Sequence, residues 1–197
     1  MSRLITSFYE FSSCDVKVYS SHENYETEDT VADVLVDVNN GVLRLGVVES
    51  YAGKKTLDAF EEGLSVFSLD DSFWFDVETI DYAFMEVYDN NIDFYHMGGC
   101  EVFVKYQSIW YDLYDLIFNN IIIITPERNS PILGDAKEAP LSGVSEVILC
   151  TSNSGVILED LQDNIADDRD FLTDLNFDET NDVRVLHAKF VQSAVAV

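Results

Sequence analysis

Basic residues are scarce in this chain of 197 residues. It holds 11 Lys and Arg against 37 Asp and Glu, and its formal net charge at pH 7 is −26. No Lys or Arg occurs between Thr56 and Val104. Nucleic-acid binding depends on contacts between basic side chains and phosphate, so this composition excludes direct binding to nucleic acid. It disfavours an anionic membrane surface for the same reason.

Cysteine and long apolar runs are scarce as well. The three cysteines, Cys14, Cys100 and Cys150, are far apart and form no CxxC pair. We therefore expect free, mostly buried thiols in a reducing compartment. Continuous apolar runs such as residues 121–124 are far too short to span a membrane. The first ten residues hold no apolar run of signal-peptide length, and we expect a cytoplasmic protein.

Apolar and aromatic residues, by contrast, are plentiful. Hydrophobic residues make up 47% of the chain and aromatic residues 13%, which is enough for a core. Between Thr56 and Val104 the acids alternate with aromatics, whereas disordered acidic tails are poor in aromatics. The segment is therefore predicted to be folded, with carboxylates on its surface.

The sequence pattern predicts an α+β fold, mainly antiparallel sheet with two or three short helices. Two β-rich runs flank Asn39-Asn40-Gly41, which predicts a hairpin over residues 31–48. Residues 84–106 are typical of a three-stranded meander, with Gly98-Gly99 as a tight turn between its last two strands.

Helical spacing of apolar residues predicts a helix that begins at Thr56, a second over 109–118 and a third from Leu158. The β-branched run at 121–125 is typical of a buried strand. All three prolines fall in residues 126–143. We expect a loop there, and the only place where a single domain of residues 1–197 could be subdivided.

No sequence motif identifies a catalytic site, a metal site or a cofactor site, and we predict none. Residues 174–185 supply some oxygens of a calcium loop, but Glu179 stands where glycine is required and Val185 where a bidentate glutamate is required. Asp15 and Lys17 have the spacing of an acid–lysine nuclease pair. A phosphate substrate would be repelled by the surrounding charge.

The charge itself leads to the main functional hypothesis, a non-enzymatic inhibitor or binding protein whose acidic surface mimics nucleic acid. Same-face carboxylates on a strand recur every ~6.6 Å, and such rows could fill the groove of a basic nucleic-acid-binding protein or complex. In general character the chain resembles the DNA mimics that phages use against restriction or CRISPR systems, which implies the host cytoplasm. The predicted contact residues are Asp70, Asp71, Asp76, Glu78, Asp81, Glu86, Asp89, Asp93, Glu159, Asp160, Asp163, Asp167, Asp168, Asp170, Asp174, Asp178 and Glu179.

Two alternatives stay open at this point. One is a virion or assembly protein with an acidic outer face. The other is an enzyme whose site cannot be recognised from sequence, and it predicts a pocket where two carboxylates or a His–acid pair converge. The sequence leaves the oligomeric state open, a homodimer included.

Overall fold

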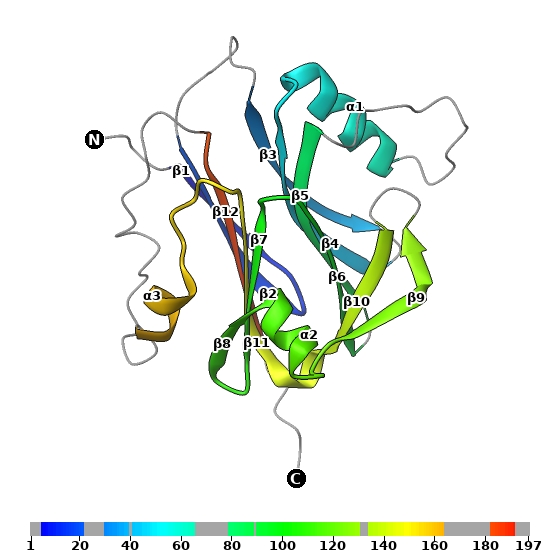
Figure 1. The fold of residues 1–197 in the computed structure, drawn as a ribbon, viewed down its shortest axis with the longest axis vertical. Coiled ribbons are helices and arrows are strands. Elements are labelled where there is room, and N and C mark those ends of the chain that lie inside the picture. Colours follow the sequence, from blue (N-terminus) through cyan, green and yellow to red (C-terminus); the bar gives the residue numbers. More distant parts are fainter. Residues whose placement is uncertain are drawn as a thin grey trace.

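The computed structural model describes residues 5–21, 30–39, 41–65, 79–88, 90–130, 134–163 and 182–191. They form two six-stranded antiparallel sheets (Figure 1). Sheet A has the order β1-β2-β12-β11-β7-β8, and sheet B has the order β3-β4-β5-β6-β10-β9. This arrangement confirms the predicted fold class. No helix in these ranges is long and apolar enough to cross a membrane.

The bounds of the strands follow the sheet orders. In sheet A they are Ile5–Glu10, Cys14–Ser20, Arg184–Phe190, Val144–Cys150, Glu101–Tyr106 and Ile109–Asp112. In sheet B they are Val31–Asn39, Val42–Ser50, Ile80–Tyr88, Asn91–Met97, Gly134–Pro140 and Ile123–Ser130. The α-helices are α1 (Lys54–Ser65), α2 (Leu113–Phe118) and α3 (Leu158–Asp163), and a 3-10 turn spans Leu141–Gly143.

The main core lies between the two sheets. Because side chains alternate between the faces of a strand, each sheet directs one apolar row inward. Leu45 and Val47 of β4 and Met85 of β5 belong to the same buried cluster as Val147 of β11 and Leu186 of β12. The two sheets are therefore held together by contacts between residues far apart in the chain.

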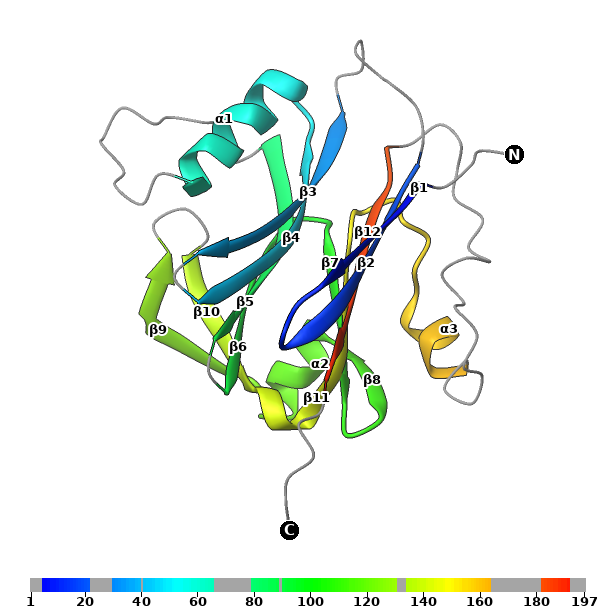
Figure 2. The same cartoon turned by 180° about the vertical axis from the view of Figure 1, so that it is seen from behind.

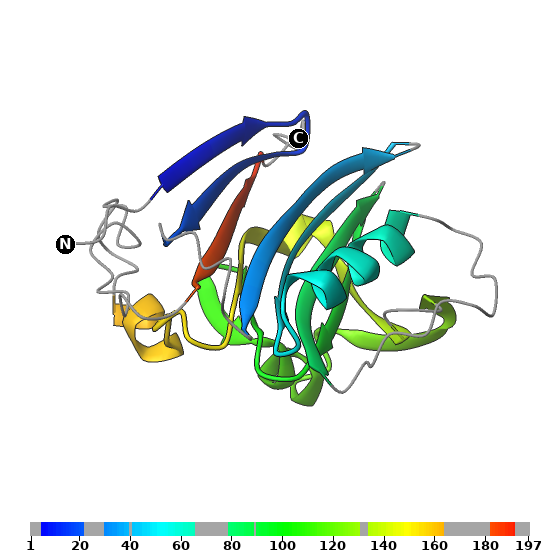
Figure 3. The same ribbon diagram turned by 90° about the horizontal axis from the view of Figure 1, so that it is seen from above.

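Smaller apolar clusters cover part of each outer face. The ring of Phe60, from α1, lies 5.6 Å from that of Tyr82 and 6.2 Å from that of Phe84 on β5. On sheet A, Leu161 of α3 belongs to a buried cluster with Trp110 of β8. Figure 2, the view from behind, shows α1 and α3 on opposite flanks of the molecule. Figure 3 shows α1 (cyan) beside sheet B and α3 (gold) on the side of sheet A.

The predicted hairpin over 31–48 is confirmed, and the turn at 98–99 is corrected. Strands β3 and β4 pair directly, and Gly41 has the positive φ of +83° that the turn requires. All three strands of the predicted meander also form. However, β7 does not pair with β6: it lies in sheet A between β11 and β8. Gly98-Gly99 therefore carries the chain from one sheet to the other.

Three further expectations need correction. Residues 109–118 form β8 followed by α2, because the Asp112 carboxylate accepts a hydrogen bond from the N–H of Asp115 (2.6 Å) and starts the helix at Leu113. Ile123 and Ile124 are more than half exposed, because β9 is the edge strand of sheet B. The predicted helix at Thr56 begins earlier, at Lys54.

The loop expected at 126–143 is largely a pair of strands. Strand β10 pairs with β9 on one side and with β6 on the other. Pro126 lies within β9, where an edge position needs no backbone donor on its open side. Proline is evidence against a central strand, but an edge strand such as β9 tolerates it.

Acidic residues also lie in rows across the outer face of sheet B. Glu86 and Glu138 stand on either side of Asp93 in the strand register. Asp93 is 2% exposed, and its carboxylate accepts a hydrogen bond from the Tyr88 hydroxyl at 2.9 Å. Burial, together with the charges of Glu138 and Glu86, raises the pKa of Asp93 to about 7.

This pKa predicts that acidification stabilises the fold. Between the usual pKa of an aspartate and pH 7, Asp93 is protonated in the folded state but ionised in the unfolded state. Its contribution to the free energy of unfolding is therefore present at low pH and is lost as the pH rises towards 7. Between pH 8 and pH 5 the free energy of unfolding of the wild type should therefore increase. In Asp93→Asn this increase should be smaller by about 1–3 kcal/mol. Urea denaturation across this range measures it. Asp163→Asn, at an exposed position of α3, is the control, and parallel profiles for wild type and Asp93→Asn would contradict the prediction.

Candidate functional site

Two carboxylates meet at one end of the sandwich. Glu49 of β4 and Asp81 of β5 are direct partners in the strand register. They continue the inward rows of their strands beyond the apolar residues Val47 and Ala83. Like charges directly opposite one another destabilise a sheet, and Glu49 is only 1% exposed. This pair therefore needs hydrogen-bond donors or a cation.

Donors from three segments bind the pair. The Ser152 hydroxyl donates to Glu49 Oε2 at 2.7 Å, and the Ser152 N–H lies 3.3 Å from the same oxygen. Asp81 Oδ2 accepts from the Gly99 N–H at 2.7 Å and from the Tyr51 hydroxyl at 2.8 Å. The Tyr51 hydroxyl is also 3.4 Å from Glu49 Oε2. We call these five residues the carboxylate site.

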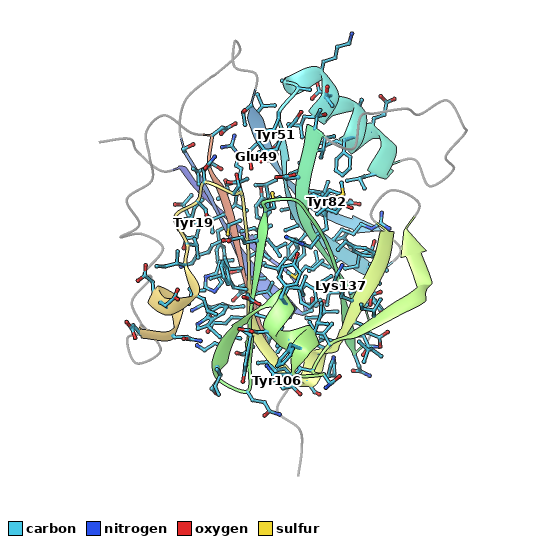
Figure 4. All side chains as sticks on the ribbon, viewed as in Figure 1. Tyr19, Glu49, Tyr51, Tyr82, Tyr106 and Lys137 are labelled. Atoms are coloured by element: carbon cyan, nitrogen blue, oxygen red, sulfur yellow. The ribbon has the colours of Figure 1, made fainter. Side chains whose placement is uncertain are left out.

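The site joins both sheets through the turns at their shared end. Glu49 and Asp81 come from sheet B, whereas Ser152 follows strand β11 of sheet A. Tyr51 lies in the turn between β4 and α1. Figure 4 shows Glu49 and Tyr51 together near one end of the molecule, with Tyr106 at the other.

Gly98 permits the close approach of Asp81 to the turn between the sheets. Its φ is +74°, and a Cβ at this position would lie 1.7 Å from Asp81 Oδ1. Any larger residue would displace the carboxylate. Gly98 thus turns the chain and also leaves space for the Asp81 side chain.

Neighbouring titratable groups are in their neutral forms. Burial raises the pKa of the Cys100 thiol, and the charges of Glu49 and Asp81 raise it further, so this cysteine is no thiolate nucleophile. Burial lowers the pKa of His96, although the hydrogen bond to the carbonyl oxygen of Cys100 opposes this. Burial also raises the pKa of Tyr51, so its hydroxyl is a donor.

The carboxylate site offers two acidic side chains, Glu49 and Asp81, as ligands for a metal ion. In the part of the chain that the structure describes, no group of three or more His, Cys, Asp or Glu side chains is placed to hold a metal ion. Two carboxylates nevertheless fit Mg²⁺, which keeps several waters and is commonly bound by one or two carboxylates together with substrate phosphates. Glu49 and Asp81 are thus the described residues that could hold such an ion.

Among the predicted contact residues that the structure describes, only Asp81 belongs to this site. Glu86 and Asp93 lie on the outer face of sheet B, and Glu159, Asp160 and Asp163 lie on α3. The structure does not bring these groups together as one surface. The other predicted contacts lie outside the described residues: Asp70, Asp71, Asp76, Glu78, Asp89, Asp167, Asp168, Asp170, Asp174, Asp178 and Glu179.

The expectations for cysteine, calcium and a nuclease pair have different outcomes. Cys14, Cys100 and Cys150 are free and buried, as predicted. The calcium-like loop falls mostly outside the described residues. Asp15 and Lys17 lie on β2, and Asp15 pairs in register with Glu10 of β1, in sheet A.

Sequence reasoning missed Glu49, Tyr51, Gly99 and Ser152. One signal was available for Glu49, which occupies the same alternating row as the buried Leu43, Leu45 and Val47. A carboxylate at an inward position of an apolar strand requires a partner or a function. No sequence signal placed Ser152 beside it, because 103 positions separate the two residues.

Comparisons with solved structures show what this fold is similar to. No family model and no curated protein matches the sequence. RsbX in complex with magnesium aligns at a TM-score of 0.56 and 11% identity, over 95% of this chain and all of that one. The catalytic domain of the serine/threonine protein phosphatase PstP with two manganese ions gives 0.53 and 13%, over 91% and 99%. Phosphatase 2C from Toxoplasma gondii gives 0.54 and 8%, over 97% and 100%. At such identities the likeness establishes the fold.

This fold corrects the function predicted from composition. The chain has the fold of solved serine/threonine phosphatases, and this likeness contradicts the prediction of a non-enzymatic nucleic-acid mimic with anti-restriction or anti-CRISPR character, which was wrong. The predicted partner, a basic nucleic-acid-binding protein, was wrong for the same reason. The error arose because net charge informs solubility and association rather than fold.

The Gly98 geometry predicts a selective loss of stability. Gly98→Ala imposes a positive φ on alanine and pushes a methyl group into Asp81, whereas Gly155→Ala imposes a similar φ of +72° with nothing within 4 Å of the new Cβ. Gly155→Ala should cost about 1–2 kcal/mol of unfolding free energy, and Gly98→Ala clearly more. Denaturant unfolding of both variants measures the difference. Equal losses would contradict the close approach at Gly98.

Proposed function

We propose that the protein is a metal-dependent phosphatase that removes phosphate from serine or threonine side chains of a protein substrate. The observation that carries the proposal is the convergence of Glu49 and Asp81 at the shared end of the two sheets. The likeness of the fold to serine/threonine phosphatases supports the same reaction class. The carboxylate site is the proposed active site.

The charge of the site requires a cation for this reaction. A phosphate ester is anionic, and it would approach two carboxylates in a chain of formal net charge −26. Direct contact would be repulsive. The RsbX and PstP structures contain magnesium and manganese, respectively. When bound, a divalent cation neutralises phosphoryl charge and lowers the pKa of a water that attacks phosphorus.

The chain's own residues would hold and orient the two carboxylates. Glu49 is fixed by Ser152 from the opposite sheet, and Asp81 is fixed by the backbone of Gly99. Hydrogen bonds of this kind lock the direction of a metal ligand and prepare its geometry before substrate binds. The apolar core behind the pair, which includes Val47 and Ala83, excludes water from that side.

The same proposal covers compartment and domain organisation. The three free thiols are buried, which supports a reducing compartment such as the cytoplasm. Strand β10 pairs with β6 as well as with β9. This pairing supports a single domain over residues 1–197 without a subdivision at 126–143.

The test is phosphate release from phosphoserine and phosphothreonine peptides in the presence of Mg²⁺ or Mn²⁺. Wild type should release phosphate, and Glu49→Gln or Asp81→Asn should reduce the rate to that of the peptide alone, because each removes half of the carboxylate pair. Glu159→Gln and Asp163→Asn make the same chemical changes on α3 and should retain the wild-type rate.

Two results would contradict the proposal. One is a folded wild-type protein that releases no phosphate from either peptide with either ion. The other is release that survives Glu49→Gln and Asp81→Asn together, because the reaction would then occur elsewhere.

A further inference from the structure

We propose that the Tyr51 side chain competes with a divalent cation for the carboxylate pair, so that it must leave Asp81 before an ion can bind both carboxylates. This inference rests on the proposed function, because it concerns the cation that the reaction would use. It assigns Tyr51 a role that sets the affinity for the ion rather than a role in the reaction itself.

The carboxylate oxygens that Tyr51 approaches already accept hydrogen bonds. A carboxylate oxygen has about two lone-pair directions. On Asp81 Oδ2 both are used, by the Gly99 N–H at 2.7 Å and by the Tyr51 hydroxyl at 2.8 Å. On Glu49 Oε2 both are used by Ser152, through its hydroxyl at 2.7 Å and its N–H at 3.3 Å. The single Tyr51 proton lies on the shorter contact, to Asp81, while the phenol oxygen is 3.4 Å from Glu49 Oε2. These two carboxylate oxygens are therefore already occupied.

The donors to the two carboxylates differ in how easily they can move. The Gly99 N–H and the Ser152 N–H belong to the backbone of turns that end strands of the sandwich. Tyr51 contributes a side chain that is 42% exposed. Its backbone N–H is bonded to the carbonyl oxygen of Thr79 at 2.8 Å. Rotation of the whole Tyr51 side chain about its Cα–Cβ bond can therefore release Asp81 while the turn keeps its place.

The Tyr51 hydroxyl is close to both carboxylates. It lies within 3.4 Å of one oxygen from each carboxylate. A divalent cation held by the two carboxylates would need lone pairs on carboxylate oxygens. Tyr51 and such a cation would therefore draw on the same groups.

The expected result is tighter metal binding when the hydroxyl is removed. Tyr51→Phe keeps the ring and deletes one hydrogen bond to a charged group, a contribution that corresponds to about tenfold in affinity for a partly exposed bond. Manganese ion alone, titrated into the full chain by isothermal calorimetry and by the loss of the free-ion electron paramagnetic signal, measures it. The dissociation constant should fall about tenfold relative to wild type.

A matched control separates this effect from a general loss of hydroxyl groups. Tyr9 of β1 is 41% exposed, almost the same as Tyr51, and lies outside the carboxylate site. Tyr9→Phe should bind manganese as wild type does. Asp81→Asn combined with Tyr51→Phe should lose the tight binding, which places the ion at the pair.

The outcomes distinguish the two proposals. If wild type binds manganese and Tyr51→Phe binds it equally or more weakly, the competition by Tyr51 is overturned while the proposed function stands. If neither protein binds manganese although both unfold cooperatively, the metal-dependent function is overturned and the competition with it. If Tyr51→Phe binds manganese more tightly than wild type and Tyr9→Phe does not, the result supports both the proposed function and the competition by Tyr51.

Discussion

The contact between the inward faces of the two sheets is the constraint on which the rest of the structure depends. Apolar rows from both sheets fill this space, for example Leu45 and Met85 opposite Val147 and Leu186. A polar group on an inward face is tolerable only where the rows end, because there it can reach turns and solvent. Glu49 lies at such an end and remains almost fully buried. The position of the carboxylate site therefore follows from the packing of the core.

The acidic side chains of the fold are of two kinds. Some are bound by basic side chains, and others lie beside another carboxylate and are bound only by neutral donors. Glu146 on the outer face of sheet A is an example of the first kind. Burial opposes its charge, but hydrogen bonds from His187 and Lys105, each 2.8 Å long, outweigh this and lower the pKa of Glu146 to about 2. Glu49 and Asp81 are of the second kind, since the donors bound to them are neutral. Such a pair is the better candidate for binding a cation.

Local features of the fold could be predicted from the sequence, whereas the site could not. The hairpin over 31–48 is specified by neighbouring residues, and its turn has the expected positive φ at Gly41. The turn at Gly98-Gly99 was recognised, but a turn signal does not say which sheet receives the next strand. The choice of sheet A depends on β11, far along the chain. Ser152 reaches Glu49 for the same reason, across 103 positions.

The turn at Gly98-Gly99 links these observations. It transfers the chain between the sheets, and the Gly99 N–H binds Asp81 over a separation of 18 positions. If β6 and β7 had paired as a simple meander, the chain would have stayed in one sheet and β7 would not lie beside β11, the strand that leads to Ser152. The crossing thus allows donors from both sheets to reach two like charges. A composition rich in carboxylates does not contain this information, because it depends on which two of them the β4–β5 register places side by side and on the crossing that brings donors to them.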